Sequence, residues 1–169
     1  MYCMSSTLKK VKMDSTKSSL KISVVLVTYN RAPMLNDVLT SLTVQSRQPD
    51  EVVVVDNCST DETRKVIESF GKKLNIKYVY EDQQGIPFAR NAGVRNASGD
   101  ILVFTDDDCV AEWDWLHYLV LPFLRDPGIG MVGGEILTCQ VTNSIIEKFC
   151  IADSMMRVGF LEKKRGSRS

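Results

Sequence analysis

The stretch Ile101-Leu102-Val103-Phe104-Thr105-Asp106-Asp107-Asp108-Cys109 decides how the rest of the chain is interpreted. Five apolar or β-branched residues run directly into three carboxylates, with no adjacent lysine or arginine to neutralise them. An apolar run of this length is typical of a strand buried on both faces of a sheet. Three neighbouring carboxylates repel one another, so their ionised forms need a cation or a network of hydrogen-bond donors.

Two interpretations of this acidic triplet follow from its position after a strand. If the chain stays extended, Asp106 and Asp108 lie on one side and Asp107 on the other. Two carboxylates on one side offer the hard oxygen ligands that an ion such as Mg²⁺ or Mn²⁺ prefers. The alternative is an acidic turn in which Asp107 and Asp108 cap the next helix.

The composition is that of a single globular domain. The chain has 169 residues, of which 44% are hydrophobic and 25% are charged, enough to bury a core. Lys plus Arg and Asp plus Glu both number 21. Because there is no basic excess to neutralise phosphates, the balance argues against a nucleic-acid partner.

The cysteines and the apolar segments bear on the compartment. Five cysteines, an odd number with no C-x-x-C spacing, argue against a disulfide framework or a zinc site and favour a reducing compartment. The most apolar helical stretch, 115–124, is too short to span a bilayer. We therefore expect no transmembrane segment and a cytoplasmic location, with basic ends that allow weak peripheral contact with an anionic membrane.

Apolar runs and helical spacing of apolar residues alternate along the chain. They predict five strands, at 22–27, 52–55, 76–80, 100–105 and 131–137. They predict intervening helices after Pro33, after an S-x-x-E capping box at 59–62, over 88–97 and over 113–124. This alternation indicates an α/β fold, with a mostly parallel central sheet and helices on both faces.

The composition and the predicted elements divide the chain into three segments. Residues 1–20 are rich in Ser and Lys and are expected to form a flexible leader. Residues 21–140 are expected to form the α/β domain. Residues 141–169 are expected to form a partial helix and a basic tail.

Polar clusters follow three of the predicted strands: 28–31, 56–57 and 106–108. In open α/β sheets, ligands bind outside the carboxyl ends of the strands, near the point where the strand order reverses. The three clusters should therefore meet at one edge of the sheet. Their convergence favours the metal-site interpretation of the acidic triplet.

The ligand class follows from the motifs. The sequence has neither a G-x-G-x-x-G after the first strand nor a G-x-x-x-x-G-K-[S/T], which disfavours dinucleotide cofactors and P-loop chemistry. A metal ion held by carboxylates usually has a polyphosphate partner. Arg31 and Arg90 can offer forked donors to phosphate, and Asp56 can accept from a base or ribose. The alternatives are solvated surface arginines and an Asp56 that only caps a turn.

Four ordered blocks together resemble glycosyltransferase family 2, a family with the Rossmann-like GT-A nucleotide-diphospho-sugar transferase fold. The resemblance covers residues 22 to about 137, the donor-binding N-terminal portion only. The blocks are Ser23-Val24-Val25-Leu26-Val27-Thr28-Tyr29-Asn30-Arg31, Val55-Asp56-Asn57-Cys58-Ser59-Thr60-Asp61, Ala89-Arg90-Asn91-Ala92-Gly93 and Phe104-Thr105-Asp106-Asp107-Asp108.

The resemblance implies a nucleoside-diphosphate-sugar donor and assigns residues to it. Thr28, Tyr29 and Arg31 would line the nucleotide pocket. Asp56 would contact the base, and Arg90 would lie near the base or the diphosphate.

The resemblance also implies Mn²⁺ or Mg²⁺ at the D-x-D motif. Asp106 would approach both the ribose and the ion, and Asp108 would ligate the ion. Asp107 ranks third as a ligand. The ion would offset the charge that develops on the diphosphate leaving group.

The expected reaction is an inverting transfer of the sugar to an acceptor, a glycan or a lipid-linked sugar. Such a displacement needs a carboxylate base, which the family places well downstream of the D-x-D block. This chain ends 61 residues after Asp108 and lacks the expected downstream pattern, so no catalytic residue is assigned. The resemblance thus predicts a C-terminally truncated GT-A domain.

Two alternatives to an active transferase remain open from the sequence. One is a truncated, non-catalytic nucleotide-sugar-binding remnant, or half of a split enzyme. The other is a metal-dependent nucleotidyltransferase, which would need a basic, Gly-rich triphosphate loop near the first strand. The segment 27–31 is not such a loop.

Overall fold

The computed structural model describes residues 20–126, 128–135 and 157–159. Its centre is a sheet of four parallel strands in the order β3-β2-β1-β4. The strands are β1 (Ile22–Thr28), β2 (Glu51–Asp56), β3 (Ile76–Tyr80) and β4 (Ile101–Asp106). The four predicted strands of the sheet are confirmed to within one residue at each end, because each is a short apolar run bounded by polar residues.

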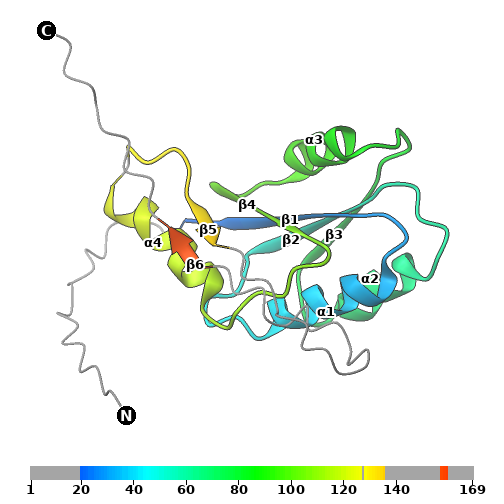
Figure 1. The fold of residues 1–169 in the computed structure, drawn as a ribbon, viewed down its shortest axis with the longest axis horizontal. Helices are drawn as coiled ribbons and strands as arrows, with labels where there is room; N and C mark the ends of the chain where they lie inside the picture. The colour runs from blue at the N-terminus through cyan, green and yellow to red at the C-terminus, as the bar shows by residue number, and fades with distance from the viewer. Residues whose placement is uncertain (1–19, 127, 136–156, 160–169) are drawn as a thin grey trace, which may run out of the picture.

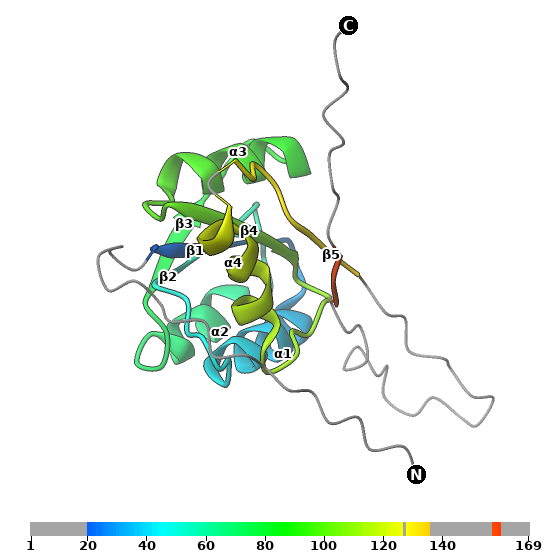
Figure 2. The ribbon, with the colours of Figure 1, turned by 90° about the vertical axis from the view of Figure 1, so that its left-hand side faces the viewer.

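Four helices cover the two faces of this sheet. They are α1 (Ala32–Thr43), α2 (Thr63–Phe70), α3 (Ile86–Asn96) and α4 (Trp115–Arg125). Figure 1 shows α3 on one face and α1, α2 and α4 on the other, and Figure 2 shows the same three layers after a quarter turn. The predicted arrangement of helices on both faces is confirmed.

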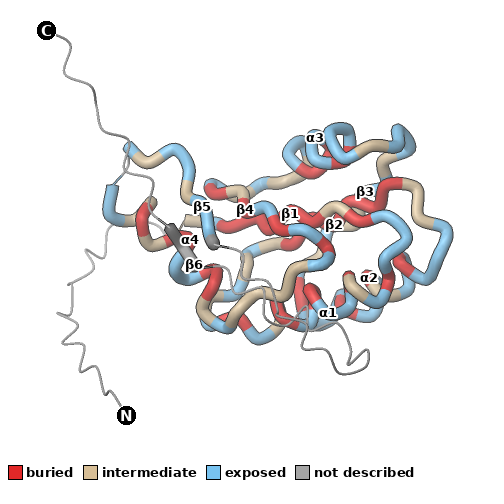
Figure 3. The backbone as a smooth tube through the Cα atoms, viewed as in Figure 1, coloured by how far each residue is buried: buried red, intermediate tan, exposed pale blue. Residues whose placement is uncertain are grey.

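The larger core lies between the sheet and the three helices on one face. Alternate residues of β1 and β2 meet the apolar sides of α1, α2 and α4 there, and the strands form the most buried part of the chain in Figure 3. The fully buried members with the largest side chains include Trp115, Ile22, Leu26, Leu35, Leu39, Leu42 and Leu116. Their burial supplies most of the driving force that holds this layer to the sheet.

Among the described residues, α3 is the only helix on the opposite face, and it packs closely on the strands. The residues of α3 that face the sheet are small, Ala89, Ala92 and Gly93, and they pack on Val25 and Val55. A Cβ added at Gly93 would lie well inside the contact distance of the Val25 side chain. The small residues thus bring the backbone of α3 close to the strands.

The strand order reverses between β1 and β4. The chain runs outward from β1 to β2 to β3, and α3 then crosses the opposite face to return β4 to the free side of β1. Thr28 is the register partner of Asp56, and Val27 is the partner of Asp106, so three strand ends lie at one edge. This is the location where open α/β sheets bind ligands.

Helix α2 begins differently from the prediction. The predicted capping box is wrong, because the helix starts at Thr63 and no side chain caps it. The Ser59 hydroxyl instead accepts from the Asn30 backbone N–H at 3.0 Å. Asp61 accepts from the Thr63 N–H at 3.0 Å and from the Ala32 N–H at 3.0 Å. The polar residues of this loop therefore join it to the loop after β1.

The predicted fifth strand is not part of the main sheet. Strand β5 (Gly133–Glu135) pairs antiparallel with β6 (Arg157–Gly159) in a separate two-stranded sheet. Strand β6 falls in the segment 141–169, where a partial helix and a basic tail were predicted. A three-residue strand is too short to show a periodicity. The rest of that segment and the predicted leader 1–19 lie outside the described residues.

The helices also bear on the membrane prediction. None of the helices in the described ranges has both the length and the apolar character needed to cross a membrane.

Candidate functional site

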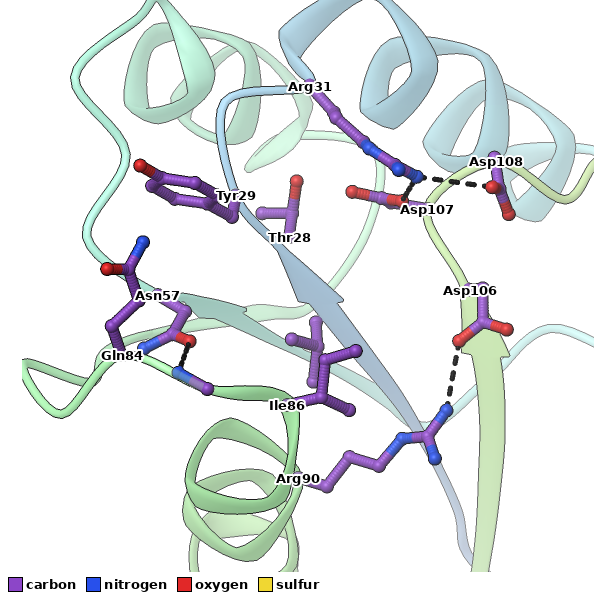
Figure 4. A pocket seen from close by; sticks show the side chains of 12 residues that line it. Thr28, Tyr29, Arg31, Asn57, Gln84, Ile86, Arg90, Asp106, Asp107 and Asp108 are labelled. Carbon is purple, nitrogen blue, oxygen red and sulfur yellow. Dashed lines mark hydrogen bonds and ion pairs between the residues drawn. The ribbon is translucent and has the colours of Figure 1, made fainter.

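A cavity of about 440 Å³ lies at the carboxyl edge of the sheet. It brings together the ends of β1 and β4, the residue after β2 and the first turns of α3 (Figure 4). Its lining residues are Val27, Thr28, Tyr29, Arg31, Asn57, Gln84, Gly85, Ile86, Arg90, Asp106, Asp107 and Asp108. All of the predicted site residues except Asp56 line this cavity.

The loop after β1 is shaped by Asn30. This residue has a φ of 52°, a left-handed conformation that Asn tolerates better than most residues. Its side-chain oxygen accepts from the backbone N–H of Thr60 at 2.7 Å and of Asp61 at 3.3 Å. The turn at Asn30 thereby places its two neighbours, Tyr29 and Arg31, along the cavity.

The acidic triplet does not stay extended. Strand β4 ends at Asp106, and the chain then turns, with the Cys109 N–H donating to the Asp106 carbonyl at 3.3 Å. The prediction that Asp106 and Asp108 share one side of an extended chain is therefore wrong in its geometry. The alternative, an acidic turn, is right about the turn but wrong about the cap, because the next helix begins at Trp115 and is not capped by Asp107 or Asp108.

Two arginines supply the positive charge that the triplet lacks in the sequence. Arg31 Nη1 donates to Asp107 Oδ1 at 3.1 Å and to Asp108 Oδ2 at 3.1 Å. Arg90 Nη2 donates to Asp106 Oδ1 at 3.1 Å. Figure 4 shows the two guanidinium groups reaching the triplet from different walls of the cavity. The fold, and not the local sequence, thus offsets part of the negative charge of the three carboxylates, with two guanidinium groups.

The three carboxylates have unlike surroundings. The side chain of Asp107 is only 8% exposed, whereas those of Asp106 and Asp108 are 62% and 47% exposed. Burial raises the pKa of the Asp107 carboxyl, and the neighbouring Thr28 hydroxyl and Arg31 oppose only part of that rise. Asp107 is thus enclosed by protein, and the other two carboxylates face the cavity.

The adjacent thiol is also affected by the triplet. Burial raises the pKa of Cys109 to about 11, and the charges of Asp108 and Asp106 contribute to the rise. A thiol with such a pKa is almost entirely protonated at neutral pH and is a poor nucleophile.

Asp56 lies at the end of β2 but does not line the cavity. It is buried, and its Oδ1 accepts from the Ser59 N–H at 2.8 Å. Its Oδ2 accepts from the Tyr78 hydroxyl at 3.1 Å. Both oxygens are therefore engaged within the protein, as the turn-capping alternative described. The predicted contact between Asp56 and a base stays a prediction.

The donor set partly fits a divalent ion. Within the described residues, no three His, Cys, Asp or Glu side chains gather in a way that could hold a metal ion. The three carboxylates predicted as ligands thus do not form a complete protein cage. Asp106 and Asp108 nevertheless present exposed oxygens to the cavity. A Mg²⁺-type ion is commonly bound by one or two carboxylates together with phosphates of the ligand.

Five lining residues were not among the predicted site residues: Val27, Asn57, Gln84, Gly85 and Ile86. Two signals in the sequence pointed to three of them. Asn57 directly follows Asp56 at a strand end, and Gly85-Ile86-Pro87 interrupts the chain just before a helix. Gly85 has a φ of 140°, a conformation that strongly favours glycine, and it precedes the first residue of α3.

The fold and the cavity agree with a comparison to known families. The model of Glycosyl transferase family 2 matches residues 23–165. The chain belongs to this family.

Relatives and solved structures are consistent with that membership. The chain is 44% identical over 148 residues to a validoxylamine A glucosyltransferase of Streptomyces hygroscopicus subsp. limoneus, covering 82% of this chain and 33% of that protein. It thus spans about a third of that relative's length. Residues 1–349 of TarS from Staphylococcus aureus in complex with UDP share 27% identity at a TM-score of 0.60, over 76% of this chain and 40% of that one.

A second solved structure is a mannosyltransferase, PcManGT from Pyrobaculum calidifontis, in complex with GDP-Man and Mn²⁺. It shares 29% identity at a TM-score of 0.60, over 71% of this chain and 36% of that one. The neighbours confirm the GT-A fold that the sequence resemblance implied.

Proposed function

We propose that this chain binds a nucleoside-diphosphate-sugar donor and transfers its sugar, with inversion, to a hydroxyl group of a glycan or a lipid-linked sugar. The observation that carries the proposal is the arrangement of the acidic triplet opposite Arg31 and Arg90, in one cavity at the switch point of the sheet. Carboxylates for an ion and guanidinium groups for phosphate are the two components that a diphosphate site requires.

The arginines take the diphosphate in this proposal. Each guanidinium has five N–H donors, and the contacts to carboxylates engage only some of them. Arg31 and Arg90 can therefore turn further donors toward phosphate oxygens while they remain near the triplet. Thr28 and Tyr29 form the adjoining wall on the β1 side, where the nucleoside would lie.

Asp106 and Asp108 would hold a divalent ion, Mn²⁺ or Mg²⁺, together with the diphosphate. When bound, such an ion supplies a Lewis acid that offsets the charge developing on the leaving group. Asp107 is the weakest candidate ligand, because its side chain is buried, whereas that of Asp108, which shares the contact with Arg31, is half-exposed.

We also propose a reducing compartment such as the cytoplasm for this chain. Cys58 and Cys109 flank the site and are both free. Free thiols close to a functional site are typical of proteins that work under reducing conditions.

The test is isothermal titration of UDP and of GDP into the purified chain, first with Mn²⁺ and then with EDTA. The proposal predicts that one of the two nucleotides binds with Mn²⁺ and that EDTA removes most of the affinity. Asp106→Asn should reduce binding in the presence of Mn²⁺. Asp100→Asn is the matched control, because Asp100 precedes the opposite end of β4, where it accepts from the Lys21 N–H.

Two results would contradict the proposal. The first is no binding of either nucleotide to a folded chain, and the second is equal binding with Mn²⁺ and EDTA. Incubating the chain with UDP-sugars or GDP-sugars and an acceptor mixture then separates a transferase from a binding remnant, because only the transferase releases free UDP or GDP.

A further inference from the structure

The buried side-chain amide of Asn57 bonds to the segment between β3 and α3 at three points. Its Nδ2 donates to the Glu81 carbonyl at 3.0 Å and to the Gln83 carbonyl at 2.9 Å. Its Oδ1 accepts from the Gly85 N–H at 2.7 Å. These three bonds engage both N–H groups and the oxygen of the amide. The Asn57 amide therefore bonds to this loop, although Asn57 also lines the cavity.

The bonds of Asn57 flank one residue, Gln84. The backbone is held at the carbonyl before Gln84 and at the N–H after it, which fixes where its side chain begins. That side chain is exposed and lines the cavity. In Figure 4 the Gln84 amide extends past Asn57 toward the side of the cavity where Tyr29 lies.

Gln84 and Tyr29 form a part of the cavity wall that carries no charge. The triplet and the two arginines provide the charges, whereas this part offers a half-exposed aromatic ring and a neutral amide. An aromatic ring provides a surface on which a base can stack. An amide presents an acceptor and a donor side by side, which matches the N3–H and O4 of uracil or the N1–H and O6 of guanine.

We infer that Gln84 is the specificity-determining residue that reads the base of the nucleotide, and that Asn57 is its positioning residue. The inference rests on the proposed donor site and deepens it. It assigns base recognition to a cavity residue. Asp56, the residue to which the resemblance assigned the base, is engaged with Ser59 and Tyr78.

The test compares a ligand that has a base with one that has none. UDP, GDP and inorganic pyrophosphate are titrated with Mn²⁺ into the full chain and into Gln84→Ala. The better-bound nucleotide should lose about tenfold in affinity in this variant, the effect expected for the loss of one or two hydrogen bonds. Pyrophosphate should bind equally to both proteins, which a general structural defect would not allow.

The neighbouring glutamine provides the matched control. Gln83 is the same residue type and is equally exposed, and its carbonyl accepts from Asn57, but its side chain does not line the cavity. Gln83→Ala should bind every probe like the unmodified chain. The role of Asn57 is tested by Asn57→Ala. As a single change, it should weaken nucleotide binding more than pyrophosphate binding. Added to Gln84→Ala, it should cause no further loss of nucleotide affinity.

The outcomes are distinguishable. If the unmodified chain binds neither a nucleotide nor pyrophosphate, the proposed function and the inference both fail. If it binds them and Gln84→Ala binds a nucleotide unchanged, only the inference fails. The inference is also overturned if Gln84→Ala weakens pyrophosphate as much as the nucleotide. A selective loss of nucleotide binding in Asp56→Asn, with Gln84→Ala unaffected, would place base reading on Asp56 instead.

Discussion

At the scale of single residues, the acidic triplet is divided by the environment of each carboxylate. Asp107 is enclosed and bonded to Arg31, whereas Asp106 and Asp108 face the cavity. Three identical side chains in a row can therefore have different tasks. All three pair with an arginine, but only Asp106 and Asp108 also expose much of their side chains, where an ion can bind.

This division predicts different effects for two isosteric changes. In Asp108→Asn, UDP or GDP binding should become about tenfold weaker with Mn²⁺ and should no longer respond to EDTA, because a ligand of the ion has lost its charge. In Asp107→Asn, binding should weaken while the response to EDTA remains, because Arg31 loses one of its two carboxylate partners and both proposed ligands of the ion are kept. Titration calorimetry with both metal states measures the two effects. Loss of the EDTA response in Asp107→Asn alone would contradict this account.

The Cys109 thiol gives a prediction about pH. Its pKa of about 11 lies above the ordinary value of 9.0, so the thiolate forms only at higher pH. At pH 8, iodoacetamide should modify Cys109 about 100-fold more slowly in the folded chain than after unfolding in urea, in proportion to the thiolate fraction. The rate in the folded chain should still be rising at pH 10. Peptide mass spectrometry measures the modification of this residue, and similar rates in both states would refute the prediction.

The residues of the site were only partly predictable from the sequence. Thr28, Tyr29, Arg31, Arg90 and the triplet follow strands or belong to recognisable blocks, and the structure gathers them in one cavity. Gln84 could not be found in this way. Its position depends on three bonds from Asn57, a residue 27 positions earlier in the chain. Contacts over such separations leave no local pattern.

At the scale of elements, the position of α3 determines the position of Arg90. The helix starts at Ile86, and its small residues let it approach the sheet closely. Arg90 lies one turn into this helix and reaches Asp106 at the end of β4. The close approach of α3 to the sheet is therefore part of the site geometry.

The close packing of α3 predicts a cost for one added methyl group. Gly93→Ala should destabilise the chain by about 1–3 kcal/mol, because its Cβ would overlap the Val25 side chain in a well-packed layer. Gly71→Ala is the control, since the nearest atom to its Cβ would be the Glu68 carbonyl oxygen at 3.5 Å. Urea denaturation measures both. Equal stability of the two variants would show that α3 does not pack as described.

The elements of the main sheet were the most predictable feature. Apolar runs such as 52–55 favour a buried strand, so the four strands of this sheet were predicted to within one residue at each end. The start of α2 was not predictable, because Ser59 bonds to the loop after β1, and Asp61 bonds both to Ala32 and to Thr63, the first residue of α2. Tertiary hydrogen bonds outcompeted the local capping pattern.

At the scale of the whole molecule, the topology of the sheet determines where the site lies. Strands β2 and β3 extend the sheet in one direction from β1, and β4 extends it in the other. Because the crossover through α3 changes face, a cavity opens between the ends of β1 and β4. The sequence predicted the alternation of strands and helices along the chain. It did not predict the pairing of β5 with β6, because this is a non-local contact between short segments.

The packing of α4 against the sheet gives a prediction for the whole fold. The chain has two tryptophans, and only Trp115 is buried, whereas Trp113 is 66% exposed. In Trp113→Phe, the remaining indole should emit at short wavelength and shift strongly to the red on unfolding. In Trp115→Phe, the emission should already be red-shifted in the folded chain. Fluorescence spectra of the two variants measure this, and identical spectra would contradict the burial of Trp115 under the sheet.

The most direct test of the central claim is anomalous diffraction at the manganese edge from crystals of the chain grown with Mn²⁺ and UDP or GDP. The account predicts one strong peak in the cavity, within coordination distance of Asp106 or Asp108 and of the diphosphate, with Arg31 or Arg90 on the phosphate oxygens. A nucleotide bound elsewhere, or a cavity that still holds only its arginine–carboxylate pairs, would contradict it.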